Sequence, residues 1–521
     1  MKLEFELIDS LPRLAWCARM RQGQDVVLVR HGPWVETSED CFFEGAWGGP
    51  FESRRFDEAV MLAGSGWRLT QEGIVFAAPS HMLERIQSIQ VGDELYVSNS
   101  FTFLLVQAGD EPDINYPDYF FDLLNYYRAG IRMTDKRIRL RGQRYVHLHD
   151  CCNIVVKPDL TISRFEKRLS NPPANYTDYV AFLEGTLQRI IRNAGHPTRK
   201  QIYRPITTIS LGYDSTAVSV LASRAGCSEA VTFRKSVSAV GYVEDSGTAI
   251  AAYLGLQTTE YERLDFNKLP GLPDAEFYLN PFLTDRSMLV MEDQLVGSLL
   301  ITGRHGENFW STDKQAHPLL QEPTAVLMSG TTLVEFRLRA GVIHLPVPYC
   351  GALHCSSIHR ITLSPEMKPW SVGGNYDRPI PRRIIEEAGV PRELFGRRKQ
   401  GGHGWLRNRD LSSASEHDFL DFYYSKVRQK RYSNLYKRGF EGAQRYAVRC
   451  LRLIGSLLRR TTVYRIMSLL VGVRLHPMWG SKYLYTFHWG FSRTKERYES
   501  ALSKSLDIVQ DNKPAARISG N

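Results

Sequence analysis

A short polar turn between an apolar strand and an apolar helix constrains this 521-residue chain more than any other stretch. Residues 206–209 are all β-branched, which favours a parallel strand buried on both faces. Residues 217–225 are rich in Ala, Leu and Val and precede Gly226, so they predict a helix. Residues 210–215 between them read Ser-Leu-Gly-Tyr-Asp-Ser. A strand that turns directly into a helix is typical of a doubly wound α/β fold.

The chemistry of this turn favours an anion. It opens a helix, so it offers backbone N–H groups and the positive end of a helix dipole. Asp214 would repel a phosphate there unless a cation lay between them, and Mg²⁺ bridges carboxylate and phosphate oxygens. The turn lacks the Gly-Lys-Ser/Thr of a Walker-type loop. An ordinary strand-to-helix turn with serine caps is the alternative interpretation.

Two further strands place polar groups at the same edge of the predicted sheet. Residues 230–233 and 258–261 predict strands, with a helix over 244–256 between them, and residues 299–302 predict a buried strand that runs into a Gly-containing turn. Ligands of doubly wound sheets bind at the carboxyl ends of the strands. Glu307 would therefore be a second carboxylate near Asp214, suited to an octahedral Mg²⁺ site completed by triphosphate oxygens. A role for Glu307 in capping the following turn is the alternative.

The first 165 residues read as β-rich. The pattern predicts turns at residues 45–50 and 64–66, a helix over 118–127, and short strands at residues 26–29, 73–78, 94–98 and 145–148. Residues 175–194 show i, i+3, i+4 apolar spacing, which predicts a core-facing helix that opens a second domain.

Residues 210–215 resemble the pyrophosphate loop of ATP pyrophosphatases, Ser-Gly-Gly-x-Asp-Ser, with Leu211 in place of the first Gly. Residues 302–307, Thr-Gly-Arg-His-Gly-Glu, resemble the Thr-Gly-x-Gly-x-Asp-Glu motif of asparagine synthetases. Residues 43–47, 64–66 and 96–101 resemble parts of that family's N-terminal domain. The resemblance spans about residues 40–405. The family that it indicates also contains β-lactam synthetases and lasso-peptide cyclases.

This resemblance implies an ATP-dependent ligase. Mg²⁺-ATP would adenylate a substrate carboxylate with release of pyrophosphate, and an amine would then attack to form an amide and free AMP. Asp214 and Glu307 would hold Mg²⁺. The implied nucleotide-binding residues are Ser210, Leu211, Gly212, Tyr213, Asp214 and Ser215 at the phosphates, Thr232 and Phe233 at the adenine, and Gly303 and Arg304 in the third loop.

Two implied catalytic residues lie further along the chain. Residues 398–404, Arg-Lys-Gln-Gly-Gly-His-Gly, look like the lysine-containing loop of β-lactam synthetases, so Lys399 would stabilise charge on the acyl adenylate and departing AMP. Residues 344–349 resemble the family's Glu-x-Arg-x-Pro-Phe stretch, which places His344 where relatives hold or deprotonate the amine. A structural histidine and a solvated basic loop are the respective alternatives.

The resemblance also implies that the N-terminal domain has lost glutaminase chemistry. In the family, a cysteine directly after the initiator Met attacks glutamine, whereas Lys2 stands there in this chain and the first cysteine is Cys17. We therefore expect a glutaminase-like scaffold of the N-terminal nucleophile type without its nucleophile. The amine would be free ammonia, a second substrate or an internal amine, and the carboxylate a small molecule, a peptide or a glycan.

The net charge of +10 is unevenly distributed. From residue 406 onward there are 22 Lys and Arg against 9 Asp and Glu, a balance of 22 − 9 = +13, so the rest of the chain carries 10 − 13 = −3. We expect four regions: 1–165, the inactive glutaminase-like domain; 175–405, an adenine-nucleotide α-hydrolase-like synthetase domain; 406–510, a basic helical extension; and 511–521, a disordered tail. The eight scattered cysteines lack metal-ligand spacing and predict a cytoplasmic protein.

Two other functions fit parts of the pattern. The basic extension is compatible with peripheral contact to an anionic membrane or with an enzyme that acts on RNA, although the acidic main body makes nucleic acid the less favoured partner. A binding or scaffold protein with a decayed ATP site is the other alternative, because the Cβ of Leu211 restricts backbone approach at the phosphate turn.

Overall fold

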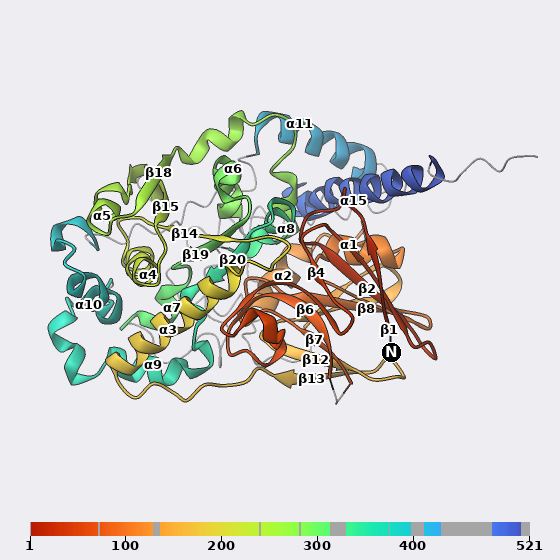
Figure 1. Cartoon of the computed structure of the whole chain (residues 1–521). Helices are drawn as coiled ribbons and strands as arrows, with labels where there is room; N and C mark the ends of the chain where they lie inside the picture. Colours follow the sequence, from red (N-terminus) through yellow and green to blue (C-terminus); the bar gives the residue numbers. More distant parts are fainter. Residues whose placement is uncertain are drawn as a thin grey trace, which may run out of the picture.

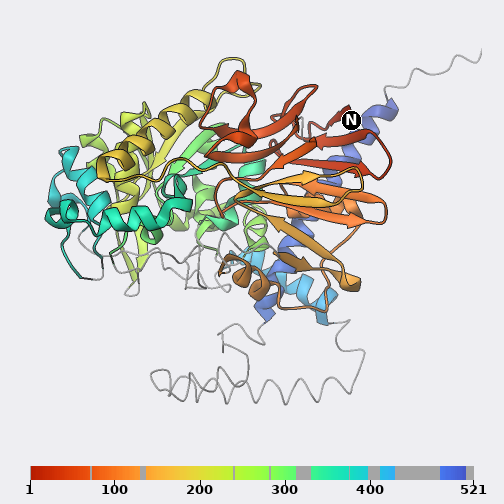
Figure 2. The same cartoon turned by 90° about the horizontal axis from the view of Figure 1, so that it is seen from below.

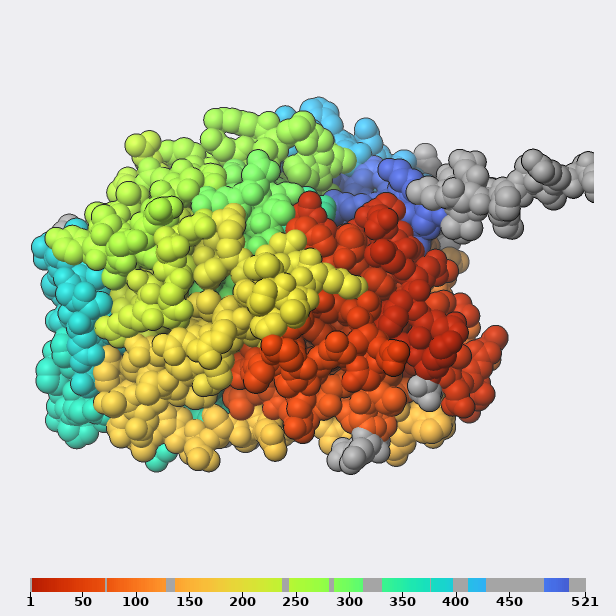
Figure 3. Space-filling view, viewed as in Figure 1, coloured from red at the N-terminus to blue at the C-terminus, as the bar shows by residue number. Residues whose placement is uncertain are grey.

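The computed structural model describes residues 2–70, 73–128, 136–238, 241–280, 283–312, 330–374, 376–396, 411–428 and 482–511. Its described part is a mixed α/β structure with a β-rich N-terminal half and a parallel sheet with helices (Figure 1). The space-filling view shows the two halves, red to orange and yellow to green, meeting along a continuous boundary (Figure 3).

The N-terminal half consists of two sheets packed face to face. In strand order, the first sheet contains β1 (Lys2–Leu7), β3 (Val26–His31), β2 (Trp16–Arg21), β9 (Glu94–Ser98), β8 (Ile86–Val91), β11 (Tyr145–His149) and β10 (Arg137–Arg139). The second contains β13 (Ile162–Glu166), β12 (Cys152–Val156), β7 (Gly73–Ala77), β6 (Leu62–Thr70), β5 (Cys41–Trp47) and β4 (Glu36–Thr37). The core between them is aromatic, with Trp16 stacked on Phe76 and Phe42 stacked on Trp67.

The predicted turns at residues 45–50 and 64–66 are wrong, because most of these residues lie inside β5 and β6. Gly45 and Gly64 face each other in the antiparallel register. Both have a φ near +125°, and a Cβ on either would lie 2.2 Å from a carbonyl oxygen of the neighbouring strand. These glycines therefore allow two strands to approach closely, and only residues 48–50 leave the sheet.

The second half contains the predicted parallel sheet. Its strand order is β18 (Gln257–Tyr261), β15 (Glu229–Phe233), β14 (Arg204–Thr208), β19 (Ser298–Thr302) and β20 (Ile343–Pro346), and all four pairings are parallel. Along β19, Leu299 and Ile301 join one core cluster and Leu300 joins another. Both faces of the sheet are therefore covered, as its apolar strands predict.

The α-helices are distributed over both halves of the molecule. Those of the first half are α1 (Phe101–Ala108) and α2 (Tyr119–Arg128). The others with described bounds are α3 (Tyr176–Ala194), α4 (Tyr213–Arg224), α5 (Thr248–Tyr253), α6 (Glu292–Leu295), α7 (Gly306–Trp310), α8 (Val334–Ala340), α9 (Cys355–Thr362), α10 (Pro379–Glu387), α11 (Ser413–Phe422) and α15 (Thr486–Asp511). The helix predicted over 244–256 is shorter, because residues 245–247 form a loop after the hairpin of β16 (Lys235–Ser238) and β17 (Gly241–Glu244).

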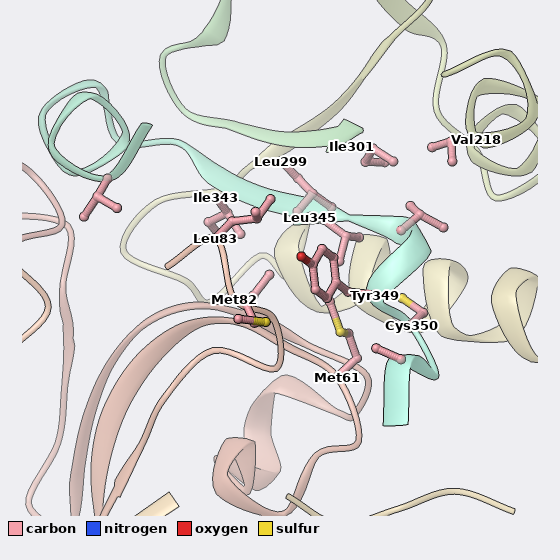
Figure 4. Packing of buried hydrophobic residues seen from close by; sticks show 14 of the residues in the cluster. Met61, Met82, Leu83, Val218, Leu299, Ile301, Ile343, Leu345, Tyr349 and Cys350 are labelled. Atoms are coloured by element: carbon pink, nitrogen blue, oxygen red, sulfur yellow. The ribbon is translucent and has the colours of Figure 1, made fainter. Parts of the chain in front are cut away.

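Apolar side chains and a buried ion cluster join the two halves. Met61, Met82 and Leu83 of the first half pack against the parallel sheet, where Leu345 and Tyr349 lie close by (Figure 4). Beside them, Arg337 of α8 donates two hydrogen bonds, of 2.8 and 3.0 Å, to the carboxylate of Glu44 in β5. Its Nε also lies 2.6 Å from the Glu84 carboxylate, and all three side chains are buried.

The helix α15 contacts both halves and runs along the far side of the β-sheets when the molecule is seen from below (Figure 2). The ring of Phe103 in α1 stacks on that of Tyr498, whose hydroxyl donates to the carboxylate of Glu335 in α8. Basic residues of this helix form ion pairs, Arg497 with Glu276 and Arg493 with Asp418. The described part of the predicted basic extension is thus helical and packed on the rest of the chain.

The described ranges include seven of the eight cysteines, and all seven are buried free thiols. No helix within the described ranges is long and apolar enough to cross a membrane.

Candidate functional site

Two loops meet where the strand order of the parallel sheet reverses. From β14 the chain continues through β15 toward β18 on one side, whereas β19 and β20 lie on the other. The loop after β14 and the loop after β19 touch, because a Cβ on Gly303 would lie 2.4 Å from the carbonyl oxygen of Asp214. A Cβ on Gly306 would lie 2.6 Å from Cγ of Asp214. The two predicted motifs therefore come together at the switch point, the usual ligand position of such sheets.

The first loop presents three successive backbone N–H groups, each of which donates to an oxygen atom. Leu211 N donates to Oδ1 of Asp245 at 3.3 Å, Gly212 N to Oγ of Ser210 at 3.2 Å, and Tyr213 N to the hydroxyl of Tyr376 at 3.2 Å. Oγ of Ser210 also shares a 2.7 Å hydrogen bond with Oγ of Ser215. The acceptors are a carboxylate oxygen and two hydroxyl oxygens.

A guanidinium contacts one of the two carboxylates predicted to hold a metal and is influenced electrostatically by the other. Arg378, at the residue before α10, donates to Oδ2 of Asp214. Burial opposes its charge, but the carboxylates of Asp214 and Glu307 outweigh this effect and raise the pKa of Arg378. The site therefore already concentrates enough negative charge to hold one buried cation.

The donor set fits Mg²⁺ only together with a ligand. Among the described residues, no group of three or more His, Cys, Asp or Glu side chains is arranged to hold a metal ion. Mg²⁺ commonly takes one or two carboxylates and completes its shell with water and phosphate oxygens. Asp214 and Glu307 meet that requirement, provided that Arg378 moves aside or shares the site.

The predicted adenine-binding residues lie at the end of β15, beside the first loop. Oγ1 of Thr232 accepts a 3.0 Å hydrogen bond from Gly247 N, and Thr232 is buried. The guanidinium of Arg263 lies 4.1 Å from the ring centroid of Phe233. Thr232 therefore holds the loop that carries Asp245, and Phe233 presents an aromatic ring at the same edge of the sheet.

The side chain of Arg304 forms an ion pair with Asp285. Its Nη1 donates to Oδ1 of Asp285 at 2.6 Å, and Oδ2 of Asp285 accepts from Gly330 N and from Oγ1 of Thr332, both at 2.7 Å. Asp285 therefore links Arg304 to the segment before α8.

His344 lies on β20 and is linked to both halves of the molecule. Its Nε2 shares a 3.0 Å hydrogen bond with Oγ1 of Thr302, directly before Gly303, and its Nδ1 lies 3.8 Å from Oε1 of Glu84. Burial, helped by nearby Arg304, lowers the pKa of His344 well below its usual value. Burial raises the pKa of Glu84 to about 8 against the opposing effect of Arg337. Near neutral pH the proton of this pair therefore resides on Glu84, and the imidazole is neutral.

Lys399 lies outside the described residues, so its predicted role stays a prediction. The sequence analysis missed Asp245, Arg378, Tyr376 and Glu84, which surround the predicted residues in the structure. Asp245 had one available signal, since it follows the second strand of the fold at the edge where ligands bind. The others come from segments distant in sequence, and no local pattern marks them.

A scan against protein-family models and a search of curated proteins each give no match to this chain.

Proposed function

We propose that this protein is an ATP-dependent, AMP-forming ligase of the asparagine synthetase type, which joins a carboxylate to an amine. The observation that carries the proposal is the meeting of residues 210–215 and 303–307 at the switch point of a parallel sheet, where the guanidinium of Arg378 contacts Asp214 and its pKa is raised by both Asp214 and Glu307. Phosphate loops and metal-binding carboxylates of nucleotide-dependent enzymes require this convergence.

The proposed roles combine the resemblance in sequence with the positions of the described side chains, and that of Lys399 rests on the resemblance alone. Ser210, Gly212 and Ser215 bind phosphate oxygens through hydroxyl and backbone donors, and Asp214 and Glu307 hold Mg²⁺. Bound Mg²⁺-ATP supplies an electrophilic phosphorus at which a substrate carboxylate is activated as an acyl adenylate. Thr232 and Phe233 lie where the adenine would be held. His344, whose imidazole is neutral near pH 7, accepts a hydrogen bond from the amine. Lys399 stabilises the departing AMP.

The proposal assigns the first 165 residues to a glutaminase-like scaffold without glutaminase activity. Lys2, at the position of the missing nucleophile, pairs with Val26 in the sheet. Cys17 is buried, and burial raises the pKa of its thiol far above the usual range. A protonated, enclosed thiol is a poor nucleophile. The amine is therefore supplied without glutamine hydrolysis, in a cytoplasmic protein with the four regions given above.

A non-catalytic protein with a decayed ATP site is the second candidate, and a specific observation favours it. The N–H groups of residues 211–213 already donate to protein oxygens, and the carboxylate of Asp245 would repel a triphosphate. Nucleotide binding must therefore displace Asp245 and the Tyr376 hydroxyl. An RNA-directed enzyme is less supported, because Arg493 and Arg497 of the described extension are engaged in ion pairs.

Calorimetric titration with ATP, with and without Mg²⁺, tests the proposal. We expect the wild type to bind ATP only with Mg²⁺ and the Asp214→Asn variant to lose this binding. The matched control is Asp93→Asn, which changes an exposed carboxylate on a turn between β8 and β9. Release of AMP and pyrophosphate with a panel of carboxylates and amines then identifies the reaction. A wild type that binds no ATP supports the decayed site.

A further inference from the structure

A pocket lies away from the switch point, on the boundary between the two halves. Its first side comes from Val60, Ser80, Cys151 and the segment after β13, residues 167–170. Its second side comes from Tyr349 and residues 351–354, which follow β20. The segment after β13 runs along the edge of the molecule toward α3 (Figure 1). The side chains of Arg168 and Leu169 are exposed, so the pocket reaches the surface there.

The lining is basic and contains no carboxylate. Lys167, Arg168 and His354 contribute to it, together with the hydroxyl-bearing residues Ser80, Ser170 and Tyr349. Burial raises the pKa of the Cys151 thiol well above its usual value, so this thiol is protonated and adds no negative charge. The polar groups of the pocket are therefore mostly hydrogen-bond donors beside positive charge, a set that suits an oxyanion.

Lys167 carries the argument. Its side chain is 3 % exposed, and among the described residues its Nζ has no hydrogen-bond partner; the buried Oγ of Ser170 has none either. A buried ammonium is costly unless it is paired. The carboxylate that acts on its pKa, that of Asp57, is already bound by two hydrogen bonds from Arg68, of 2.6 and 2.7 Å. A positive charge and a hydroxyl are thus enclosed at one place without a partner.

We propose that this pocket binds a small oxyanion, a carboxylate or a phosphate, which pairs with the ammonium of Lys167 and the hydroxyl of Ser170. The site does not use the switch-point loops and does not depend on the proposed ligase activity. Because its two sides come from the two halves of the chain, a bound anion connects the linker after β13 to the segment after β20. Anion binding there stabilises the boundary between the halves.

The first test measures the reactivity of Lys167 in the intact wild type. The protein is pulsed with an N-hydroxysuccinimide ester in increasing sodium acetate or inorganic phosphate, with chloride at matched ionic strength as the reference. Burial lowers the pKa of Lys167 to about 8, so a detectable fraction is uncharged and reactive at mildly alkaline pH. We expect saturable protection of Lys167, read by peptide mass spectrometry, while exposed Lys157 is labelled equally in all three salts. Protection by acetate identifies a carboxylate site, and protection by phosphate identifies a phosphate site.

The second test compares thermal unfolding of the wild type with that of Lys167→Met, a variant of similar length without charge. We expect the variant to melt at a higher temperature than the wild type in chloride, since an unpaired buried charge is removed. We also expect acetate or phosphate to raise the melting temperature of the wild type but not that of the variant. Lys157→Met is the matched surface control. Equal labelling of Lys167 in all salts, or an equal anion effect on wild type and Lys167→Met, overturns the proposal. If Lys167→Met fails to fold, the labelling measurement on the wild type decides alone.

Discussion

Arg378 donates a hydrogen bond to the carboxylate of Asp214 although 164 residues separate them. The segment before α10 thereby reaches the loop between β14 and α4. Burial opposes the charge of Arg378, but Asp214 and Glu307 together raise its pKa, so both predicted metal ligands act on one guanidinium. This contact links the candidate site to α10, which packs on α4. A metal ion bound by Asp214 must therefore compete with the guanidinium of Arg378.

Replacing Arg378 by Gln is expected to destabilise the protein in the absence of divalent cations, because two carboxylates lose a buried cation. Loss of one partner of a buried pair costs about 3–5 kcal/mol. We further expect Mg²⁺ to raise the melting temperature of the variant more than that of the wild type, since its competitor is gone. Arg382→Gln is the control, because Arg382 lies in the first turns of α10, four residues after Arg378, but pairs with Glu386. Equal Mg²⁺ effects on all three proteins would mean that Mg²⁺ and Arg378 do not compete for the same carboxylates.

The two loops touch so closely at Gly303 that any side chain there must separate them. We expect Gly303→Ala to weaken Mg²⁺-dependent ATP binding by about tenfold or more and to cost about 1–3 kcal/mol of stability. Calorimetric titration and urea unfolding measure the two effects. Gly48→Ala is the control, since a Cβ there would meet no atom closer than 3.9 Å. Unchanged ATP binding in Gly303→Ala would show that the loop contact does not form part of the nucleotide site.

The sequence predicted the parallel sheet well, because its strands are short β-branched or aliphatic runs between clear turn signals. The strands at residues 230–233, 258–261 and 299–302 are confirmed within one residue at their starts. The same turn signals failed at Gly45 and Gly64, since glycine marks both a turn and a close approach of two strands. Only the antiparallel register distinguishes the two uses, and register depends on long-range pairing.

The sequence predicted mainly those residues of the candidate site that directly follow strands. Ser210, Asp214 and Glu307 follow strands directly, so the rule that ligands bind at carboxyl strand ends brings them together. Arg378 and Glu84 reach the site from a helix start and from the first half, and their partners are set by tertiary packing. Arg304 was expected near phosphate but lies against Asp285, a buried carboxylate that no local pattern singles out.

The buried cluster at the boundary between the halves predicts unequal effects for its members. Arg337→Met leaves the carboxylate of Glu44 buried without its cation, so we expect a loss of about 3–5 kcal/mol in the free energy of unfolding at neutral pH. Glu84→Gln is expected to change it by less than about 1 kcal/mol, because burial raises the pKa of Glu84 to about 8 and its neutral form resembles Gln. Urea unfolding at pH 7 measures both. Similar losses in the two variants would mean that Glu84 is ionised there.

Asp245 makes the free energy of unfolding depend on pH, and one substitution isolates this contribution. Burial raises the pKa of Asp245 from 3.8 to about 6, against the hydrogen bond from Leu211 N. The folded state therefore binds this proton more tightly than the unfolded state, so the stabilisation is fully present below pH about 4 and is lost as the pH rises through about 6. The difference of about two pKa units corresponds to at most about 3 kcal/mol.

Asp245→Asn keeps an oxygen acceptor for Leu211 N but removes the charge. We expect the free energy of unfolding of the wild type to fall, relative to that of this variant, between pH about 4 and about 7, and the two curves to run parallel above that. Urea unfolding at a series of pH values measures the difference, in which the titration of all other groups cancels. Because the same charge faces the loop that would hold a triphosphate, Asp245→Asn is also expected to bind Mg²⁺-ATP more tightly than the wild type at neutral pH. Parallel curves over the whole range would mean that the pKa of Asp245 is the same in the folded and the unfolded protein. Tighter ATP binding together with parallel curves would separate the effect of Asp245 on ATP binding from its effect on stability.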